Sequence, residues 1–569
     1  MSEATFRVDV SSRTVTKEAV PAGWRRLGGR GLIPRILLDE VLPNCAPFGP
    51  FNKLVFAPGL LVGHMLSSCD RLSVGGKSPL TGGIKESNAG GTTALKLVQL
   101  GIKALIVEGA PSDEGWWVLH VSSQGGRFHA ANDLVGKGVH ESAETLLERF
   151  GRKVAIALIG PAGEMGLTSA GIQNLDKDRE PSRIAARGGL GALMGAKRLK
   201  AIVIDDTGGK KPEIVDQTLY RDAARRYTRA LMEHPQTAVY AEYGTAAMTQ
   251  LCQSHGGLPT RGFSSGRFEG AEKISGESLR ELILARGGDG ETTHACMPGC
   301  VIRCSNCYAD VDGTKIVSPV EYETIGLVGS NLGIDDLDMI ARLNHEINDL
   351  GMDTIEIGAA LGVAAEAGLM EFGDGPRALE LLQEIRRNSP LGRVIGHGAA
   401  TVGKVFGVQR VPVVKGQAIS AYDPRAIKGT GVTYATSPQG ADHTCGLTIR
   451  AQVDHQDPKG QAALSRTAQI NMAGYDTLGV CLFGGFGFAV ANDAIRDLLK
   501  GRYGWDVGSD ALQVLGRETL ELELAFNQAA GFTAADDRIP EWMTLEPLPP
   551  HGAVFDVPAQ DLDTIFQWG

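Results

Sequence analysis

The sequence predicts an α+β protein in which a β-rich N-terminal domain precedes two mainly α-helical domains. Short apolar runs bounded by Gly, Pro or charged residues fill the first 207 positions, as buried strands do. Beyond Lys210-Lys211-Pro212 the apolar residues recur at helical spacing. A chain of 569 residues is also too long for one hydrophobic core. We therefore predict a β-rich domain over 1–210 and helical domains over 211–410 and 411–569.

Four apolar runs are the strongest strand candidates in the N-terminal part: 53–57, 103–107, 154–158 and 200–204. The segments 100–107 and 197–204 echo one another, which indicates two similar halves. Glycine is unusually abundant, with 75 residues against a typical share of about 7%. The glycines cluster where a backbone turns tightly or approaches a ligand.

Two glycine-rich loops lie between the predicted strands, over 75–91 and 183–195. Neither has the spacing of a dinucleotide fingerprint or of a Walker A loop. Both place many backbone N–H groups beside Arg and Asn side chains, which is how a chain binds phosphate. Ordinary tight turns are the alternative interpretation.

Six helical segments are predicted in the rest of the chain from apolar spacing, end signals and composition, one of them rich in Ala and Gly and running from the Gly351 turn to about residue 370. Ser278 and Glu281 form a capping box that predicts a helix start, and Gly351 predicts a helix end. The other predicted helices cover 217–234, 278–287, 335–350, 376–388 and 510–530.

The most informative stretch contains four cysteines within twelve residues, in a chain that has only nine: Cys296, Cys300, Cys304 and Cys307. Thiols this close form a metal site or a disulfide knot, and nothing else in the sequence indicates secretion. The spacing suits an iron–sulfur cluster with three ligands from one loop and a distant fourth. Cys481, in a glycine-lined turn, is the candidate for that fourth ligand.

Two alternatives use Cys307. The spacing of Cys300, Cys304 and Cys307 matches the cluster loop of radical SAM enzymes, although Asn306 stands where those enzymes usually have an aromatic residue. A structural zinc site could instead use all four thiols of the loop.

Two turns share one design: Asn348-x-x-Gly351-x-Asp353 and Asp476-x-x-Gly479-x-Cys481. Each places acceptor side chains and a glycine on a tight bend after a helical stretch. Together they predict a paired site that recognises NH-rich rings, whereas one such bend alone is usually a helix end.

Net charge of −10 argues against nucleic acid or an anionic membrane as the main partner. The first ten residues alternate like a strand and contain no basic region followed by an apolar run, so we expect no signal peptide. No apolar run is long enough to span a bilayer. We therefore expect a cytoplasmic protein with reduced thiols.

Taken together, the motifs resemble the aldehyde:ferredoxin oxidoreductase family. They occur in the family's order from near residue 28 to about residue 530, so the resemblance covers nearly the whole chain. The segments that carry it are Arg71, Lys77-Ser-Pro-Leu-Thr-Gly-Gly83, Glu86-Ser-Asn88-Ala-Gly90-Gly91, Arg187-Gly-Gly-Leu-Gly-Ala-Leu-Met-Gly195, Glu321-Tyr-Glu323-Thr324, Ala421-Tyr-Asp-Pro-Arg425, Gly440-Ala-Asp-His443 and Asp476-x-x-Gly479-x-Cys481.

The resemblance implies tungsten, less often molybdenum, on two pterin cofactors joined by magnesium, beside one [4Fe–4S] cluster. The cluster ligands it implies are Cys296, Cys300, Cys304 and Cys481. The family's usual loop is CxxCxxxC, and the first gap here is one residue longer, so Cys307 could replace Cys296. Arg71 would bridge cluster and pterin.

The resemblance also assigns the remaining residues. Those implied at the pterin phosphates and their magnesium are Asn88, Gly90, Arg183, Ala186 and Arg187. Those implied at the pterin rings are Asn348, Asp353 and Asp476, with Asn348 standing where the family has Asp. Glu321 or Glu323, together with His443, would be the acid–base groups.

The implied function is oxidation of aldehydes to carboxylic acids, with electrons passing singly to a ferredoxin or an iron–sulfur partner subunit. An alternative keeps the cofactor but changes the substrate, for example to an aromatic acyl-CoA thioester. A third possibility is a non-redox protein whose cysteine loop is a zinc clip. A homo-oligomer or a hetero-oligomer is compatible with each.

Overall fold

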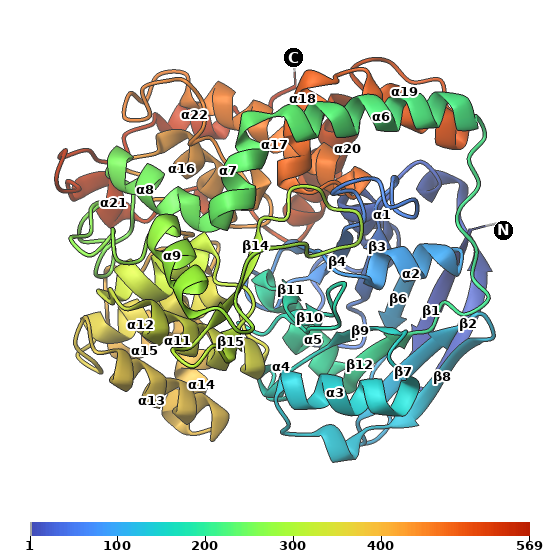
Figure 1. Cartoon of the computed structure of the whole chain (residues 1–569), viewed down its shortest axis with the longest axis horizontal. Coiled ribbons are helices and arrows are strands. Elements are labelled where there is room, and N and C mark those ends of the chain that lie inside the picture. Colours follow the sequence, from blue (N-terminus) through green and yellow to red (C-terminus); the bar gives the residue numbers. More distant parts are fainter. Residues whose placement is uncertain (1–2, 569) are drawn as a thin grey trace.

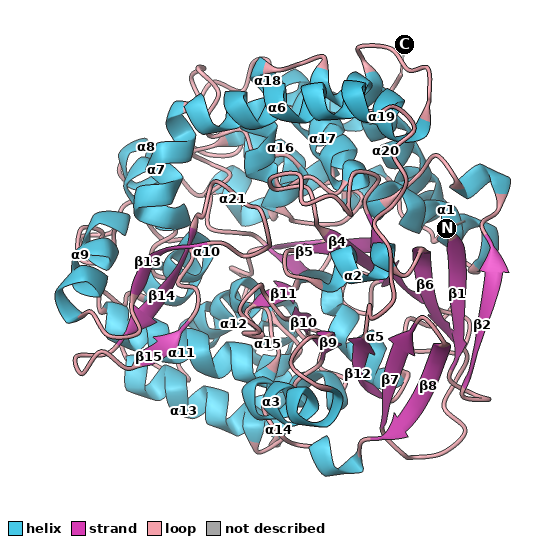
Figure 2. Cartoon of the chain, turned by 45° about the vertical axis from the view of Figure 1, so that its right-hand side comes forward, coloured by secondary structure: helices cyan, strands magenta, loops and turns pink. Residues whose placement is uncertain are grey.

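The computed structural model describes residues 3–568 and confirms the predicted α+β class (Figure 1). Strands gather in the N-terminal part, drawn in blue and cyan, and helices form most of the remainder. Figure 2 shows the same separation by secondary structure, with the two large sheets beside one another and helices around them.

The N-terminal part contains two six-stranded sheets. The first has the order β2-β1-β6-β3-β4-β5, from β1 (Ala4–Asp9), β2 (Thr14–Ala19), β3 (Leu54–Pro58), β4 (Leu72–Lys77), β5 (Ile84–Ala89) and β6 (Ile102–Glu108). The second has the order β11-β10-β9-β12-β7-β8, from β7 (Trp117–Ser122), β8 (Gly125–Ala130), β9 (Ala155–Leu158), β10 (Ile172–Asn174), β11 (Arg183–Ala185) and β12 (Leu199–Ile204).

The second sheet repeats the topology of the first. In each sheet the first strand pairs with the next in an antiparallel hairpin and with the last strand in parallel. The last strand, β6 or β12, then pairs antiparallel with the third strand, β3 or β9. The fourth and fifth strands follow at equivalent places, as β4 and β5 in the first sheet and as β10 and β11 in the second. The sequence echo falls on the equivalent strands β6 and β12, whose apolar side chains are buried. The prediction of two similar halves is therefore confirmed.

Helices connect these strands at equivalent places. The segment α2 (Thr93–Gln99) lies between β5 and β6, and α5 (Leu190–Ala196) lies between β11 and β12. The others in this part are α1 (Gly29–Glu40), α3 (Val139–Phe150) and α4 (Pro161–Glu164). The prediction that 75–91 and 183–195 are loops is therefore wrong for much of both segments, because the first contains the end of β4 and all of β5, and the second contains β11 and most of α5.

The middle of the chain is mainly helical and includes a small three-stranded sheet, β13-β14-β15. Its elements are α6 (Gln217–Glu233), α7 (Pro235–Tyr243), α8 (Met248–His255), α9 (Gly276–Arg286), β13 (Glu291–His294), β14 (Ser305–Ala309), β15 (Lys315–Val317), α10 (Tyr322–Thr324), α11 (Leu337–Leu350), α12 (Thr354–Glu366), α13 (Gly375–Arg386), α14 (Pro390–Gly396) and α15 (Ala399–Phe406).

The last part adds a short hairpin and further helices. These are β16 (Val413–Val414), β17 (Gln417–Ala418), α16 (Lys428–Thr436), α17 (Gln461–Leu478), α18 (Gly485–Val490), α19 (Ala494–Tyr503), α20 (Ala511–Ala529), α21 (Glu541–Leu545) and α22 (Ala559–Asp563). One hydrophobic core includes residues on both sides of position 410, such as Val402 and Tyr434. Helix α6 packs on α18, where the rings of Tyr227 and Phe488 stack at 3.9 Å. The division into three domains stays a prediction.

Most predicted helices lie within a few residues of the observed ones, but the capping box at Ser278 is wrong. Helix α9 begins at Gly276, so Ser278 and Glu281 lie inside it. The N-cap is Ser275, whose extended backbone lets its side chain accept a hydrogen bond from the Ser278 N–H at 3.2 Å.

Over residues 3–568, we find no single helix long and apolar enough to cross a membrane. Helix α17 and the segment Leu482–Val490 reach that length and composition only together, and they meet at a bend of 106°.

Candidate functional site

A cavity of about 330 Å³ lies where the two sheets meet the helical part. Every site residue predicted from the sequence lines this cavity, except Cys300. The residues come from β5, from β11 and the loop after it, from α10, from the turns after α11 and α17, and from the loop around His443. Segments hundreds of residues apart therefore form one wall.

The remote thiol of Cys481 lies with the cysteine loop. Cys296, Cys304 and Cys481 all line the cavity. Cys300 is adjacent, because its Sγ lies 3.5 Å from the hydroxyl of Ser68, whose carbonyl accepts the Cys481 N–H at 2.7 Å. Burial raises the pKa of Cys304 well above its usual value, and the other three thiols raise it further. All nine cysteines are free, so the four thiols can act as ligands.

Cys307 lies apart from this group. It belongs to β14 and is not part of the cavity lining. Its neighbours are Ser318 and Glu291 rather than the other thiols. The structure therefore favours Cys296 over Cys307 as the thiol that accompanies Cys300, Cys304 and Cys481. It does not support a site that uses all four thiols of the loop.

The first sheet presents Arg71 and Asn88 to the cavity. The Arg71 guanidinium donates to the side-chain oxygen of Asn88 and, at 3.4 Å, to its carbonyl. The Asn88 amide donates in turn to Glu86 at 3.3 Å. A Cβ at Gly90 would lie only 3.1 Å from the Cys296 sulfur, so a side chain there would crowd the thiol.

The second sheet presents Arg183 and Arg187. Arg183 donates to the Ser305 hydroxyl at 2.9 Å and lies 3.7 Å from the Glu321 carboxylate. Arg187 is buried and donates to Asp353 at 3.2 Å and to the hydroxyl of Ser420 at 3.2 Å. The backbone of Ala186, beside it, lines the cavity. Because Arg187 donates to acceptors on separate segments, its side chain holds these parts of the cavity wall together.

The two predicted turns have the same structure. Gly351 and Gly479 end α11 and α17 in the left-handed conformation, with φ of 77° and 80°. This leaves Asn348 and Asp476 in the last helical turns, facing the cavity. Asp353 then caps α12 by accepting the Ile355 N–H at 3.0 Å.

The candidate acid–base groups form a connected network. The Nε2 atom of His443 lies 3.0 Å from the Glu323 carboxylate, and its Nδ1 lies 3.0 Å from the Ser420 hydroxyl. Tyr422 also donates to Glu323, at 3.0 Å. The backbone just after Glu323 forms a π-helical turn, Ile325–Gly329, a feature often found at functional sites.

The two glutamates differ in protonation. Burial raises the pKa of Glu321, and the charge of Glu323 adds to this effect. Burial alone would also raise the pKa of Glu323, but the charge of and hydrogen bond from His443 lower it below its usual value. The surroundings therefore shift the pKa values of the two carboxyl groups in opposite directions, as in sites that pair a proton-exchanging carboxyl with an ionised one.

Sequence reasoning missed several residues that support the site. Ser420 and Tyr422 hold His443 and Glu323, and Lys85 forms a buried ion pair with Asp442 at 2.6 Å. Arg30 holds Glu523 through two hydrogen bonds of 2.8 Å. Some of these residues lie in or beside the motifs quoted above, but spacing along the chain could not indicate which of them pair.

Part of the cavity lining is apolar. Its side chains are Tyr240, Met248, Leu447, Met472 and Phe483. The rings of Tyr240 and Phe483 lie 4.2 Å apart, and Arg450 donates to the Tyr240 hydroxyl at 2.6 Å. Thr444, which also lines the cavity, is exposed. This part suits the carbon skeleton of a small molecule.

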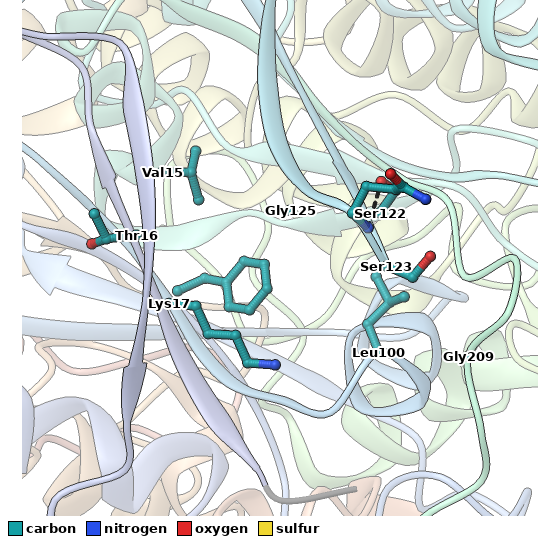
Figure 3. A pocket seen from close by; sticks show the side chains of 10 residues that line it. Val15, Thr16, Lys17, Leu100, Ser122, Ser123, Gly125 and Gly209 are labelled. Carbon is teal, nitrogen blue, oxygen red and sulfur yellow. Dashed lines mark hydrogen bonds between the residues drawn. The ribbon is translucent and has the colours of Figure 1, made fainter.

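A second cavity, of about 310 Å³, lies between the two sheets near β2 and the β7–β8 turn (Figure 3). Lys17, Ser122 and Ser123 surround it with apolar and glycine residues. Its ten described lining residues include no thiol, imidazole or carboxylate. It therefore lacks the groups that a redox or acid–base site requires, and we assign it no catalytic role.

A cavity that three thiols line, with a fourth adjacent and with arginines, amides and carboxylates in the rest of the lining, is typical of a metal- and cofactor-dependent oxidoreductase. The chain belongs to the aldehyde ferredoxin oxidoreductase family. The N-terminal domain model of that family matches residues 5–206, and the model of its domains 2 and 3 matches residues 222–566. The resemblance inferred from the motifs is thus confirmed.

Relatives match over most of the chain. A tungsten-containing aldehyde ferredoxin oxidoreductase from Pyrococcus abyssi is 32% identical over 577 residues, covering 96% of this chain and 91% of the relative. An aliphatic sulfonate oxidoreductase WOR-like subunit from Pyrococcus furiosus is 26% identical and covers 80% of this chain and 74% of the relative. The solved active-site complex BamBC of benzoyl coenzyme A reductase, with 1,5-dienoyl-CoA, shares the fold, with a TM-score of 0.79 at 18% identity over 95% of this chain and 90% of that chain.

Proposed function

We propose that this protein oxidises aldehydes to carboxylic acids with a tungsten bis-pterin cofactor and passes the electrons through one [4Fe–4S] cluster. The observation that carries the proposal is the convergence of the predicted residues on one cavity, from both sheets and from the helical part. Relatives named as tungsten-containing aldehyde ferredoxin oxidoreductases support the metal and the reaction.

The residues present fit this cofactor. Two equivalent strands, β5 and β11, reach the cavity from the two sheets, which suits a cofactor with two similar pterin halves. Asn88, Arg183 and the backbone at Ala186 would hold the phosphates and their magnesium. Asn348, Asp353 and Asp476 would accept hydrogen bonds from the rings. When bound, the cofactor supplies a metal that takes up an electron pair.

The thiols fit a four-cysteine cluster. Cys296, Cys300 and Cys304 come from one loop and Cys481 from another, the three-plus-one arrangement that such clusters often use. Burial raises the pKa of Cys296 to about 12, so its thiolate form requires a nearby positive charge, which cluster iron supplies. Arg71 also lowers the pKa of Cys296 and of Cys481, which suits a bridge between cluster and pterin.

Protons are handled by this chain's own side chains. Converting an aldehyde and water to a carboxylic acid releases protons, so a base must accept them. We assign that base to Glu321, whose raised pKa suits proton exchange. Glu323, whose pKa is lowered, and Ser420 hold the two ring nitrogens of His443, which would fix the position of this ring beside the substrate.

Two parts of the site indicate the kind of substrate and the place where an electron acceptor would dock. The apolar wall at Tyr240 and Phe483 favours aldehydes with an apolar chain or ring. The cysteine loop reaches the surface at exposed Gly299, beside Met65. A ferredoxin or an iron–sulfur subunit docking there would be close to the thiols, and such a subunit would make the protein a hetero-oligomer.

Elemental analysis of anaerobically purified protein tests the cofactors. We expect a brown protein with about four iron atoms per chain and with tungsten, or molybdenum in its place. Aldehyde-dependent dye reduction tests the reaction, with aromatic acyl-CoA thioesters as the competing substrates. Colourless protein without iron or tungsten, or activity with acyl-CoA thioesters alone, would contradict the proposal.

A further inference from the structure

Cys307 is the thiol of the cysteine loop that the proposed cluster does not use, and it faces a different set of ligand atoms. In the small sheet, Cys307 on β14 lies opposite Glu291 on β13, and His294 is at the other end of β13. One ligand atom from each of Glu291, His294 and Cys307 lies within 4.8 Å of the others. Cys307 and His294 are buried, whereas the Glu291 side chain is 59% exposed.

The hydrogen bonds of His294 determine which of its nitrogens is available. Its Nε2 lies 3.0 Å from a carboxylate oxygen of buried Asp176. A carboxylate accepts hydrogen bonds, so the Nε2 N–H is the group that donates to Asp176, and the lone pair on Nδ1 is left to bind a ligand.

That lone pair points at another acceptor. The Nδ1 atom lies 3.2 Å from the Glu291 carboxylate, which also offers only lone pairs when ionised. Two acceptor atoms at this distance repel one another unless a proton or a metal ion lies between them. The ring can gain a second proton, or a metal ion can bind both atoms.

We propose that Glu291, His294 and Cys307 bind a zinc ion through carboxylate oxygen, Nδ1 and Sγ, with water in the fourth position. Zinc prefers tetrahedral sites built from sulfur, imidazole nitrogen and carboxylate oxygen. Asp176 would act as the carboxylate that orients a metal-bound histidine through its other nitrogen, a common feature of zinc sites. The exposed side of Glu291 leaves room for the ion to enter and for the water.

The other side of His294 is a poorer metal site, although Asp176 and Asp178 approach it. The oxygens of Asp176 already accept the N–H groups of Asp178 at 2.8 Å and of Glu180 at 3.1 Å, and the Ser182 hydroxyl at 3.0 Å. Asp176 is thus fixed as an anchor of its own loop, and the thiol is on the Nδ1 side.

An ion at this place would close the base of the cluster-binding loop. His294 and Cys307 flank the segment 295–306, which carries three of the proposed cluster ligands. Joining its ends reduces the conformational freedom of the segment before the cluster forms. Through Asp176 the same ion would also fix the loop that leads to Arg183. The inference concerns zinc alone and does not depend on the proposed reaction.

Metal analysis of the full-length, anaerobically purified protein tests this site. We expect one zinc per chain in the unmodified protein, and loss of that zinc in Cys307→Ser. Cobalt(II) added to zinc-depleted protein should give a sulfur-to-cobalt charge-transfer band that Cys307→Ser lacks. Asp178→Asn and Cys45→Ser are the matched controls, and both should retain zinc and the cobalt band.

Glu291→Gln keeps the test decisive if Cys307→Ser does not fold, because that side chain is mostly exposed. In competition with a chelator, Glu291→Gln should bind zinc at least about tenfold more weakly. Zinc or a cobalt band that persists unchanged in both variants, or unmodified protein that binds neither ion, would overturn the proposal. Protein with zinc but without iron or tungsten would contradict the proposed function and leave this site supported.

Discussion

Replacing Ser420 with alanine should reduce turnover without weakening substrate binding. The Ser420 hydroxyl lies 3.0 Å from Nδ1 of His443 and accepts a hydrogen bond from Arg187 at 3.2 Å. It is fully buried and is not part of the cavity lining. Its loss leaves a buried imidazole nitrogen without a partner, which costs about 1–3 kcal/mol. If this cost adds in full to the activation free energy, kcat decreases about 5- to 150-fold.

The assay is steady-state aldehyde oxidation with a viologen acceptor, with iron and tungsten contents matched between variants. We expect KM to stay within about twofold, because Ser420 does not touch the cavity. Ser420→Thr keeps the hydroxyl and should recover most of the turnover. Ser437→Ala, at another buried serine of the same region, should leave kcat unchanged. Unaltered kcat in Ser420→Ala, or an equal loss in Ser420→Thr, would refute the role of this hydroxyl.

Three further predictions concern the thiols, the protons and the fold. Cys481→Ser should lower the iron content and the charge-transfer absorbance of the purified protein, and full retention of iron would contradict its role as a ligand. Burial raises the pKa of Glu321, so activity should fall as pH decreases through a value above the usual 4.5; Glu321→Gln should abolish that limb of the pH profile, and an unchanged limb would exclude Glu321 as the base. Glu523→Ala should destabilise the protein by about 3–5 kcal/mol in urea unfolding, because buried Arg30 loses its bidentate partner and keeps only the longer contact with Asp476 at 3.4 Å. Glu521→Ala, on the same helix but exposed, should cost at most about 1 kcal/mol, and equal effects of the two variants would contradict this reasoning.

Features that depend on nearby residues could be predicted from the sequence. The turns at Gly351 and Gly479 were predictable because a left-handed helix end favours glycine, whatever surrounds it. The strands β6 and β12 were predictable because strands buried inside a sheet are continuously apolar. Even the repeated sheets left a trace in the sequence, since equivalent strands have similar environments.

Features that depend on long-range pairing were not predictable. Ser275 and Ser278 both meet the local rule for a helix cap, and only the backbone conformation selects Ser275. Lys85 pairs with Asp442, a residue 357 positions away, and spacing carries no information on such a contact. The same limit applies to the cysteines: four thiols in one loop were evident, but their three-dimensional positions separate Cys307 from the rest.

The two sheets have the same topology, and both reach the thiols and the acid–base network across the cavity. On the first sheet, Asn88 is bound by Arg71, whose guanidinium lowers the pKa of Cys481 and of Cys296 against the effect of burial. Beyond the equivalent strand of the second sheet, Arg187 instead binds Ser420 and so reaches the histidine and glutamate of the acid–base network. Neither sheet serves one group alone, because Arg183 of the second sheet lowers the pKa of Cys296 and Lys85 of the first sheet pairs with Asp442 beside His443. The proposed reaction must remove both electrons and protons from one substrate, so a cavity in which both sheets reach the thiols and the acid–base network suits it.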